Sequence, residues 1–440
     1  MSSEWPLVAI ENICELIVDC VNKTAPVVDQ VTPYRMIRTT NVRNGRINLD
    51  ECRYVEDDTY KTWTRRAQLR IGDVILTREA PIGEVGLVTE AEGVFLGQRL
   101  MQYRANPSVL DSRYLLYSFL SPALQHQFNS HEGSGSVVSH IRVGDCFKFK
   151  LRLPPLTIQR EIAVVLGAID DRIALLRETN DTLESIAQAL FKSWFVDFDP
   201  VRAKMEGRAP EGMDEATAAL FPDSFEESEL GLVPKGWDPV PLSNVVDFKE
   251  GPGIRNWQYT NTDEGTRFIN IRCIQAGDLT LDSANRISDE EANGKYAHFH
   301  LAPWDIVVST SGTLGRSAIV REEHLPLMLN TSVIRFRPMA GKAVFSYLHQ
   351  YLNGAEFLYK LESMASGSVQ KNFGPMHLKQ IQLLCPSFPV LEAYEAICRP
   401  LYEEVVANRA HAQTLITLRD TLLPRLISGQ LRLPEINKVA

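Results

Sequence analysis

The chain lacks the segments that would place it in a membrane or in the disulfide-rich secreted class. Its 440 residues contain no run of about 18 apolar residues, so neither a transmembrane helix nor a membrane partner is expected. The N-terminus, Met1 to Pro6, has no basic stretch followed by an apolar core, so no signal peptide is expected. The seven cysteines are scattered, their number is odd, and no Cys-x-x-Cys occurs. These features indicate reduced thiols in a cytoplasmic protein.

Motifs for catalysis are nearly absent as well. No Gly-x-x-x-x-Gly-Lys-[Ser/Thr] is present, so no phosphate-binding loop is expected. Neither Asn-Pro-Pro-[Tyr/Phe] nor Asp-Pro-Pro-Tyr occurs, although an amino-methyltransferase would carry one of them. The nine histidines show no spacing typical of metal ligands. We therefore predict no catalytic residue, no metal site and no cofactor bound by this chain.

Two weak matches to enzyme motifs remain. Residues 248–253 (Phe-Lys-Glu-Gly-Pro-Gly) resemble a cofactor loop, but no strand–helix unit surrounds them, which favours a turn. Pro222-Asp223 followed by Asp247-Phe248-Lys249 fits a nuclease pattern, Pro-Asp with a later [Asp/Glu]-x-Lys, that is common by chance. Pro222 lies in a segment without regular pattern, and Ile17 replaces the lysine in the other half of the chain.

Charge is distributed unevenly along the chain. The formal net charge is −9, and residues 197–236 alone hold 10 acidic and 4 basic side chains. The remaining globular parts are therefore close to neutral. This balance neither excludes a local basic face nor supplies one.

The most informative feature is an internal repeat at an offset of 232 residues. Trp5 recurs as Trp237, residues 73–75 (Asp-Val-Ile) as 305–307 (Asp-Ile-Val), and residues 135–137 (Gly-Ser-Val) as 367–369 (Gly-Ser-Val). We expect this match to hold without a gap from about residue 5 to residue 196. A solenoid unit has roughly 20–50 residues, so a period this long indicates a duplicated domain. A duplicated chain suggests a two-fold target.

Each repeat is predicted to begin with an α+β domain, at residues 1–150 and 237–386. Short β-rich runs such as 35–38, 73–77 and 306–310 are separated by Gly, Asn and Asp turns, and helical patterns occur near 112–128 and 344–363. Residues 199–236 have no counterpart and are rich in Pro, Gly and acid, which predicts a linker with a short helix near 213–220. Residues 431–440 are expected to form a tail.

A long helix is predicted to follow each domain, at residues 151–198 and 387–430. In the first helix two heptad rows hold, respectively, Ile162, Ile169, Leu176, Leu183 and Leu190, and Leu166, Ile173, Asn180, Ala187 and Trp194. The second helix repeats the pattern with Asn408 in one row, while Pro424 and Gly429 weaken its end. The rows predict an antiparallel coiled coil with pseudo-two-fold symmetry, in which Asn180 faces Asn408. This register leaves Ile169 against Arg419. The alternative is that each helix packs on its own domain.

Polar loops that contain glycine recur in both domains. Loop one comprises residues 78–83 and 309–316, and loop two comprises 131–140 and 363–372. Glycines let the backbone approach a phosphate, while polar side chains donate to phosphates or base edges. The predicted DNA-binding residues are Arg38, Arg43, Arg65, Arg66, Arg78, Ser134, Ser136, His140 and Arg142 in the first repeat, and Arg255, Asn256, Trp257, Tyr259, Arg272, Ser309, Ser311, Arg316, Ser366, Ser368, Lys371 and Asn372 in the second.

The chain resembles the specificity (S) subunits of type I restriction–modification enzymes. The resemblance rests on residues 153–162 (Leu-Pro-Pro-Leu-Thr-Ile-Gln-Arg-Glu-Ile), on 189–198 (Ala-Leu-Phe-Lys-Ser-Trp-Phe-Val-Asp-Phe), and on the linker at 199–207 and 231–237. It implies two target-recognition domains held apart by two conserved helices, each domain reading half of a bipartite double-stranded DNA sequence.

The same resemblance implies partners that carry the chemistry. These are two methylation (M) subunits, which bind S-adenosylmethionine, and restriction (R) subunits, which use ATP and Mg for translocation and cleavage. Residues 384–389 (Leu-Cys-Pro-Ser-Phe-Pro) lack the Gln-Arg-Glu of the first repeat, so the equivalence of the two docking faces is open.

Three functions remain to be separated. A non-catalytic DNA-reading subunit is the expected one. A stand-alone DNA-modifying enzyme is disfavoured by the missing motifs. A protein-binding scaffold without base readout stays open because the domains are nearly neutral.

Overall fold

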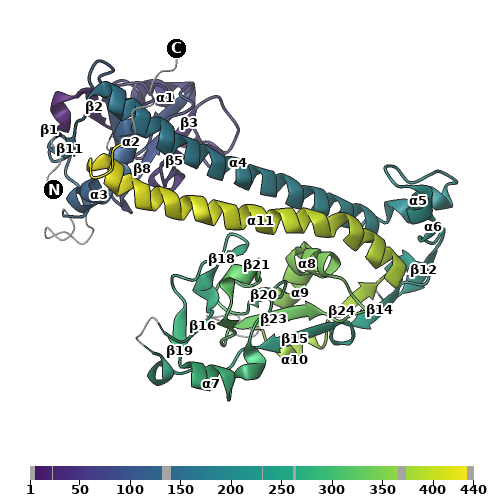
Figure 1. Cartoon of the computed structure of the whole chain (residues 1–440). Helices are drawn as coiled ribbons and strands as arrows, with labels where there is room; N and C mark the ends of the chain where they lie inside the picture. The colour runs from purple at the N-terminus through teal and green to yellow at the C-terminus, as the bar shows by residue number, and fades with distance from the viewer. Residues whose placement is uncertain are drawn as a thin grey trace, which may run out of the picture. The chain divides into compact units, whose positions relative to one another are not determined.

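The computed structural model describes residues 5–21, 23–130, 140–229, 231–260, 264–364 and 373–433. The chain divides into two compact units, Met1–Leu175 with Ala412–Ala440 and Leu176–His411. Each unit contains one repeat and a part of each of the two long helices, α4 (Leu156–Phe195) and α11 (Phe388–Ile427) (Figure 1). Both long helices therefore form where the heptad rows predict them.

The first unit contains the elements of the first repeat. Its strands are β1 (Leu7–Ala9), β2 (Cys14–Asp19), β3 (Arg35–Ile37), β4 (Val42–Arg43), β5 (Arg46–Ile47), β6 (Arg53–Tyr54), β7 (Val74–Arg78), β8 (Ile82–Leu87), β9 (Val94–Leu96), β10 (Leu100–Ala105) and β11 (Lys150–Arg152). Its helices are α1 (Asp57–Trp63), α2 (Ser112–Leu120) and α3 (Pro122–Asn129), with 3-10 turns η1 (Ile10–Asn12) and η2 (Thr39–Asn41).

The second unit contains the linker and the second repeat. Its strands are β12 (Phe225–Ser228), β13 (Gly231–Pro234), β14 (Asp238–Pro241), β15 (Val246–Glu250), β16 (Thr266–Phe268), β17 (Ile274–Gln275), β18 (Asp278–Leu279), β19 (Asn285–Ile287), β20 (Ile306–Ser309), β21 (Ser317–Ile319), β22 (Leu327–Met328), β23 (Val333–Pro338) and β24 (Gln382–Cys385). Its helices are α5 (Asp199–Met205), α6 (Glu215–Ala219), α7 (Asp289–Asn293), α8 (Phe345–Asn353), α9 (Ala355–Met364) and α10 (Pro375–Leu378), with 3-10 turns η3 (Leu242–Asn244), η4 (Asn256–Gln258), η5 (Ile271–Cys273), η6 (Ala297–Phe299) and η7 (Glu322–His324).

The two repeats have the same sheet topology, which confirms the duplicated α+β fold. The four-stranded sheet has the order β2-β10-β7-β8 in the first repeat and β15-β23-β20-β21 in the second. Three-stranded sheets β6-β3-β9 and β19-β16-β22 correspond in the same way, each with one antiparallel and one parallel pair. The pairs β1-β11 and β14-β24 close each domain.

The expectation of a gap-free repeat was wrong in two stretches. Within β2 and β15 the offset is 231, since Ile17 pairs with Tyr103 and Phe248 pairs with the equivalent Phe336. The second stretch is longer and lies further along the chain. The antiparallel pairs Val74–Leu87 and Ile306–Ile319 keep the offset of 232. From β9 onward the offset is 233. This is seen at α2 and its equivalent α8, which begin at Ser112 and Phe345. It returns to 232 at Lys150 and Gln382, where the domains close. The second repeat therefore has one additional residue between β21 and β22 and one fewer after α9.

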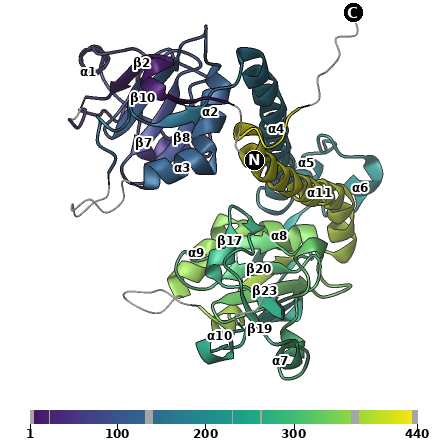
Figure 2. The same cartoon turned by 60° about the vertical axis from the view of Figure 1, so that its left-hand side comes forward.

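Each four-stranded sheet lies between two apolar cores, which explains its uninterrupted apolar strands. In β7, Val74 and Leu76 belong to the core under α2 and α3, and Ile75 belongs to a second core on the opposite face. In β20, Ile306 and Val308 likewise belong to one core, and Val307 belongs to the core on the opposite face. Figure 2 shows α2 and α3 beside β7, β8 and β10 of the first unit, and these helices contact those strands.

The predicted asparagine pair forms in the second unit. The Asn408 Nδ2 donates to Asn180 Oδ1 at 3.0 Å, and the Asn180 Nδ2 donates to the Val405 carbonyl at 3.3 Å. Both asparagines are buried, at 7% and 5% exposure for Asn180 and Asn408. The predicted antiparallel register is confirmed at this position.

The apparent flaw in that register is resolved within the first unit. Arg419 does not oppose apolar surface, because its Nη1 donates to Asp170 Oδ1 at 2.9 Å. The neighbour of Ile169 in the sequence is thus the counter-ion of Arg419. Pro424 does not end α11, which continues to Ile427.

The linker is more structured than its composition suggests. Helix α6 confirms the expected short helix, and α5 and the β12–β13 hairpin add regular structure. Val201 and Phe221 are buried, and the Phe221 ring meets the Trp194 ring edge-on at 5.1 Å between centroids. A few apolar residues among many Pro, Gly and acidic ones are enough to pack this segment on the end of α4.

Candidate nucleic-acid interface

In each repeat the end of the strand that leads into loop one and the residue that directly follows loop two meet at the same edge of the four-stranded sheet. In the first repeat, the Arg78 amide donates to the Arg99 carbonyl at 2.8 Å, and the Ile141 amide donates to the Arg78 carbonyl at 2.9 Å. Ile141 directly follows loop two, so the end of loop two is tied to the end of β7. We call this edge, formed by the end of β7, the start of β10 and the segment around Ile141, the recognition edge of the first domain.

The second repeat has the equivalent recognition edge, with the same two hydrogen bonds. The Thr310 amide donates to the Ser332 carbonyl at 2.9 Å, and the Phe373 amide donates to the Thr310 carbonyl at 3.3 Å. Here the edge consists of the end of β20, the start of β23 and the segment around Phe373. Two domains with an identical backbone frame thus present different side chains at the same place.

A glycine with a left-handed backbone shapes loop one in both domains. Gly83 has a φ of +84° and Gly315 a φ of +76°, a conformation that L-residues adopt only with strain. A Cβ added to Gly83 would lie 3.0 Å from Gln125 Oε1, and one added to Gly315 would lie 2.2 Å from Leu358 Cδ2. Loop one therefore passes closely over α3 and α9.

Most predicted DNA-binding residues that the structure describes lie at the surface. Exposed side chains are those of Arg65, Arg66, Arg142, Arg255, Asn256, Trp257, Arg272 and Arg316. Partly exposed ones are those of Arg38, Arg43, Arg78, His140, Tyr259 and Ser311. Ser134, Ser136, Ser366, Ser368, Lys371 and Asn372 lie outside the described residues. Base contacts by any of these residues stay a prediction.

Four of the predicted arginines also hold local structure. Arg38 Nη2 donates to the Glu51 carbonyl at 3.2 Å, and Arg43 Nη1 donates to the Thr39 carbonyl at 2.7 Å. Arg78 Nη1 donates to the Ile141 carbonyl at 3.0 Å, and Arg66 pairs with the Asp19 carboxylate. These guanidinium groups are therefore oriented before any ligand arrives, which lowers the entropic cost of a contact.

Ser309 differs from its prediction in that it is buried, at 1% exposure. Its hydroxyl donates to the Thr313 carbonyl at 2.7 Å and accepts from the Arg316 amide at 3.0 Å. Both hydrogen-bonding functions are used inside loop one, so the hydroxyl holds the loop in shape. The serine pattern in the sequence did not distinguish this structural serine from exposed ones.

A cavity of about 290 Å³ with both polar and apolar lining opens beside the recognition edge of the first domain. Thr24, Arg38, Gln98 and Arg99 contribute to its lining, together with Ala25. Within the described residues, the buried Nε of Arg38 has no hydrogen-bond partner. The cavity therefore offers cationic donors at a concave surface, a combination suited to a phosphate or to the acceptor groups of a base.

Behind the recognition edges lie two equivalent ion pairs that sequence reasoning missed. Arg104 donates from Nε and Nη2 to the two oxygens of Asp73, both at 2.8 Å. Arg337 does the same to Asp305, at 2.7 and 2.8 Å. The hydrogen bonds to Asp73 raise the pKa of Arg104 above its ordinary value. The pairs lie at the opposite end of β7 and β20, so they stabilise the sheet and do not form part of the interface.

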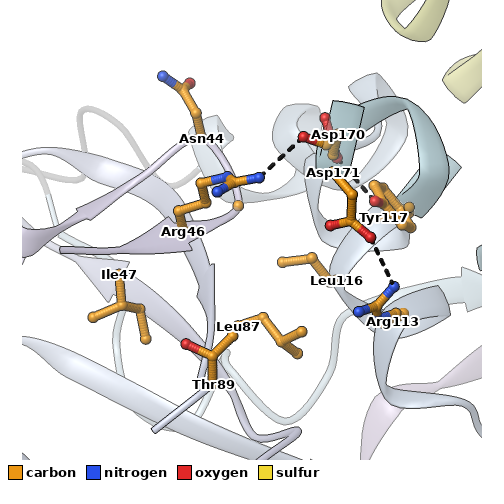
Figure 3. A pocket seen from close by; sticks show the side chains of 12 residues that line it. Asn44, Arg46, Ile47, Leu87, Thr89, Arg113, Leu116, Tyr117, Asp170 and Asp171 are labelled. Atoms are coloured by element: carbon orange, nitrogen blue, oxygen red, sulfur yellow. Dashed lines mark hydrogen bonds and ion pairs between the residues drawn. The ribbon is translucent and has the colours of Figure 1, made fainter. Parts of the chain in front are cut away.

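The first domain is joined to α4 and α11 through Asp170, which sequence reasoning also missed. The Asp170 carboxylate accepts from the Tyr117 hydroxyl at 2.8 Å and from Arg419, while its carbonyl accepts from Arg46 Nη2 at 3.0 Å. Asp170, Tyr117 and Arg46 line a cavity of about 210 Å³, and Figure 3 shows Tyr117 and Arg46 directed toward Asp170. Burial and the nearby Asp170 raise the pKa of Tyr117, so its phenol stays a donor. The signal in the sequence was the arginine that opposed Ile169.

A second contact between the first domain and α4 is made by Gln159, in the motif at residues 153–162 that carried the family resemblance. Its side chain is fully buried and donates to the Val109 and Pro154 carbonyls, both at 2.9 Å, while its Oε1 accepts from the Asp111 amide at 2.9 Å. At the other repeat the position is Leu391, and Glu395 instead accepts from the Ser346 amide at 2.8 Å. The Gln of this motif therefore fixes α4 to its domain.

Comparison with known proteins gives consistent results. Residues 2–185 match the family model for the type I restriction modification DNA specificity domain. The chain is 24% identical over 379 residues to the MjaIX specificity subunit of Methanocaldococcus jannaschii, which covers 84% of this chain and 81% of that relative. It is 24% identical over 384 residues to the HindI specificity subunit of Haemophilus influenzae, with 78% and 82% covered.

A solved structure agrees at the level of the fold. The crystal structure of the type I restriction–modification S subunit from M. genitalium aligns with a TM-score of 0.55 at 15% identity, over 97% of this chain and 96% of that one. The chain thus shares its overall fold with this S subunit. In sequence the chain is similar, over most of its length, to specificity subunits of type I restriction–modification systems. Within the described residues, no helix is long and apolar enough to cross a membrane.

Proposed function

We propose that this chain reads a bipartite duplex DNA sequence for a type I restriction–modification complex, with one half-site for each domain. The observation that carries the proposal is the pair of recognition edges. They share backbone hydrogen bonds and a left-handed glycine, yet differ in their exposed side chains. A common frame with different donors is what two different half-sites require.

The exposed face of α4 supplies a docking surface for the methylation subunits. Val164, Leu175 and Ile186 are 68%, 51% and 44% exposed and follow each other at intervals of 11 residues. Eleven residues correspond to about three helical turns at 3.6 residues each, so the three side chains share one face. An apolar row of this kind is typical of a helix that a partner helix covers.

In this proposal the chain is non-catalytic, and its partners bind S-adenosylmethionine, ATP and Mg. Among the described residues no group of three His, Cys, Asp or Glu side chains could hold a metal ion.

The test is to map methylated adenines in DNA exposed to the assembled complex. We expect two fixed half-sites, and we expect no methylation by the purified chain with S-adenosylmethionine alone. A chimera in which a relative's domain replaces residues 1–150 should change one half-site and leave the other intact. A chimera that alters both halves, or methylation by the chain without partners, contradicts the proposal.

A further inference from the structure

Trp257 is a large apolar side chain in an unusual setting. Its exposed fraction is 81%, whereas Trp194 and Trp237 are buried at 4% and 2%. Single exposed apolar residues are common on protein surfaces. A tryptophan that a well-ordered turn holds in solvent is different, because burial of its large apolar ring would stabilise the fold.

The turn that carries Trp257 is fixed on both sides. The Gln258 Oε1 accepts from the Arg255 amide at 3.0 Å, and the Gln258 Nε2 donates to Glu291 Oε1 at 2.9 Å and to the Tyr296 hydroxyl at 3.1 Å. The neighbouring Tyr259 ring packs on Phe268 at 5.2 Å between centroids. Side chains on both flanks of the indole are thus anchored in the domain, and η4 presents the indole on a rigid support.

This turn is continuous with the recognition edge of the second domain. The Thr331 amide donates to the Pro252 carbonyl at 3.0 Å, and the Ile254 amide donates to Asn330 Oδ1 at 3.4 Å. Residues 330–332 in turn hold the end of β20 at that edge through the Thr310–Ser332 hydrogen bond. The exposed Arg255 lies two residues before Trp257 in the chain, so a cationic group is close to the indole in sequence.

The first domain has a cavity in the corresponding connection. The connection between β2 and β3 contains Ala25, and the connection between β15 and β16 contains Trp257. Ala25 is buried at 4% exposure and lines the cavity of about 290 Å³ that contains Arg38 and Arg99. In these connections one domain therefore presents a cavity and the other a projecting aromatic ring.

We infer that Trp257 is a specificity-determining wedge that stacks on the bases at one step of the half-site read by the second domain. The inference rests on the proposed function and deepens it. Apolar side chains that wedge between base pairs unstack them, and the energy required depends on the base step, with pyrimidine–purine steps the easiest to open. Such a residue selects sequence through deformability and needs no hydrogen bond to a base. The first domain, with its cavity, would then rely on polar contacts.

The test uses the assembled complex of this chain with its methylation subunits and the target sequence obtained by methylation mapping. Trp257→Ala should bind the target duplex about tenfold more weakly, the loss of roughly one aromatic–base stack. Trp257→Phe should retain most of the affinity. Ile71→Ala is the control, because Ile71 is 74% exposed but lies before β7, at the end of the sheet away from the recognition edge. All three variants should melt at the temperature of the unmodified chain.

A spectroscopic measurement identifies the contact. With 2-aminopurine in place of single adenines, the unmodified complex should increase the fluorescence at one step of the second half-site, and Trp257→Ala should abolish that increase. If the Trp257→Ala complex still binds the target selectively, with the affinity and the fluorescence of the unmodified complex, the wedge is overturned and the proposed function stands. Loss of the methylation subunits from the Trp257→Ala complex would assign the indole to a protein contact and also overturn it. If the unmodified complex methylates DNA without sequence preference, both the wedge and the proposed function are contradicted.

Discussion

The buried pair Asn180–Asn408 allows a direct test of how the long helices find their register. Replacing Asn180 alone by leucine leaves the Asn408 amide without its acceptor at a position that is 5% exposed. An orphaned buried amide costs about 1–3 kcal/mol. The reverse substitution, Asn408→Leu, leaves Asn180 Oδ1 without its donor, while Asn180 Nδ2 keeps the Val405 carbonyl as acceptor.

The double variant should behave differently from the sum of the two. With leucine at both positions no polar group is orphaned, and two apolar side chains fill the seam. We expect the double variant to exceed either single variant in stability by about 2 kcal/mol, a coupling typical of residues in contact. Since Asn180 and Asn408 both belong to the second unit, its unfolding transition should report the change.

The assay is urea unfolding of the full chain, followed by circular dichroism, for the unmodified protein, both single variants and the double variant. Gln188→Leu serves as control, because Gln188 is exposed on the same helix. If the losses of the two single substitutions simply add in the double variant, the asparagines do not depend on each other and the reasoning is refuted. If the double variant gains stability but forms assemblies of a new size, the pair's main contribution is to register.

Three further perturbations follow from the structure. Gly315→Ala should destabilise the second domain by more than 1–2 kcal/mol, roughly the cost of a left-handed L-residue, because its Cβ also meets Leu358, and a thermal melt equal to that of the unmodified chain would contradict this. Asp170→Ala should lower the melting temperature of the first unit by removing the acceptor of Tyr117 and Arg419, with Asp171→Ala, whose partner lies 3.8 Å away, as the milder control. Burial lowers the pKa of His324 from 6.5 to about 4, so the unfolded state binds a proton first as the pH falls. Stability should then be complete above about pH 6.5 and decline toward pH 4 by at most about 1.4 kcal/mol per pH unit, and a His324→Gln variant with an unchanged slope would refute that assignment.

Features set by local pattern could be predicted from the sequence. Heptad rows placed both long helices, and the burial of Asn180 and Asn408 fixed their register because each amide needs a polar partner. The recurrence of glycine in loop one was also visible in the sequence, but its reason, a left-handed backbone at Gly83 and Gly315, came from the structure.

Features that depend on long-range contacts could not be predicted in this way. Asp170 is one acidic residue among many on a helix surface, and only the fold brings Tyr117 and Arg419 to it. Ser309 looked like a surface donor, but the path of its own loop uses the hydroxyl. The one-residue change of offset was hidden because identical residues in the two repeats are too sparse to locate a compensated insertion.

That change of offset shows how the domain accommodates changes in length. The additional residue lies between β21 and β22 and the missing one follows α9, both in connections, whereas β24 and the start of α11 return to the original phase. A shift of one position within a helix would rotate every later side chain by about 100° around its axis. Insertions and deletions that cancel before the helix begins leave the asparagine seam untouched. Connections between elements can therefore change in length over generations, while the helical frame stays the same in both copies.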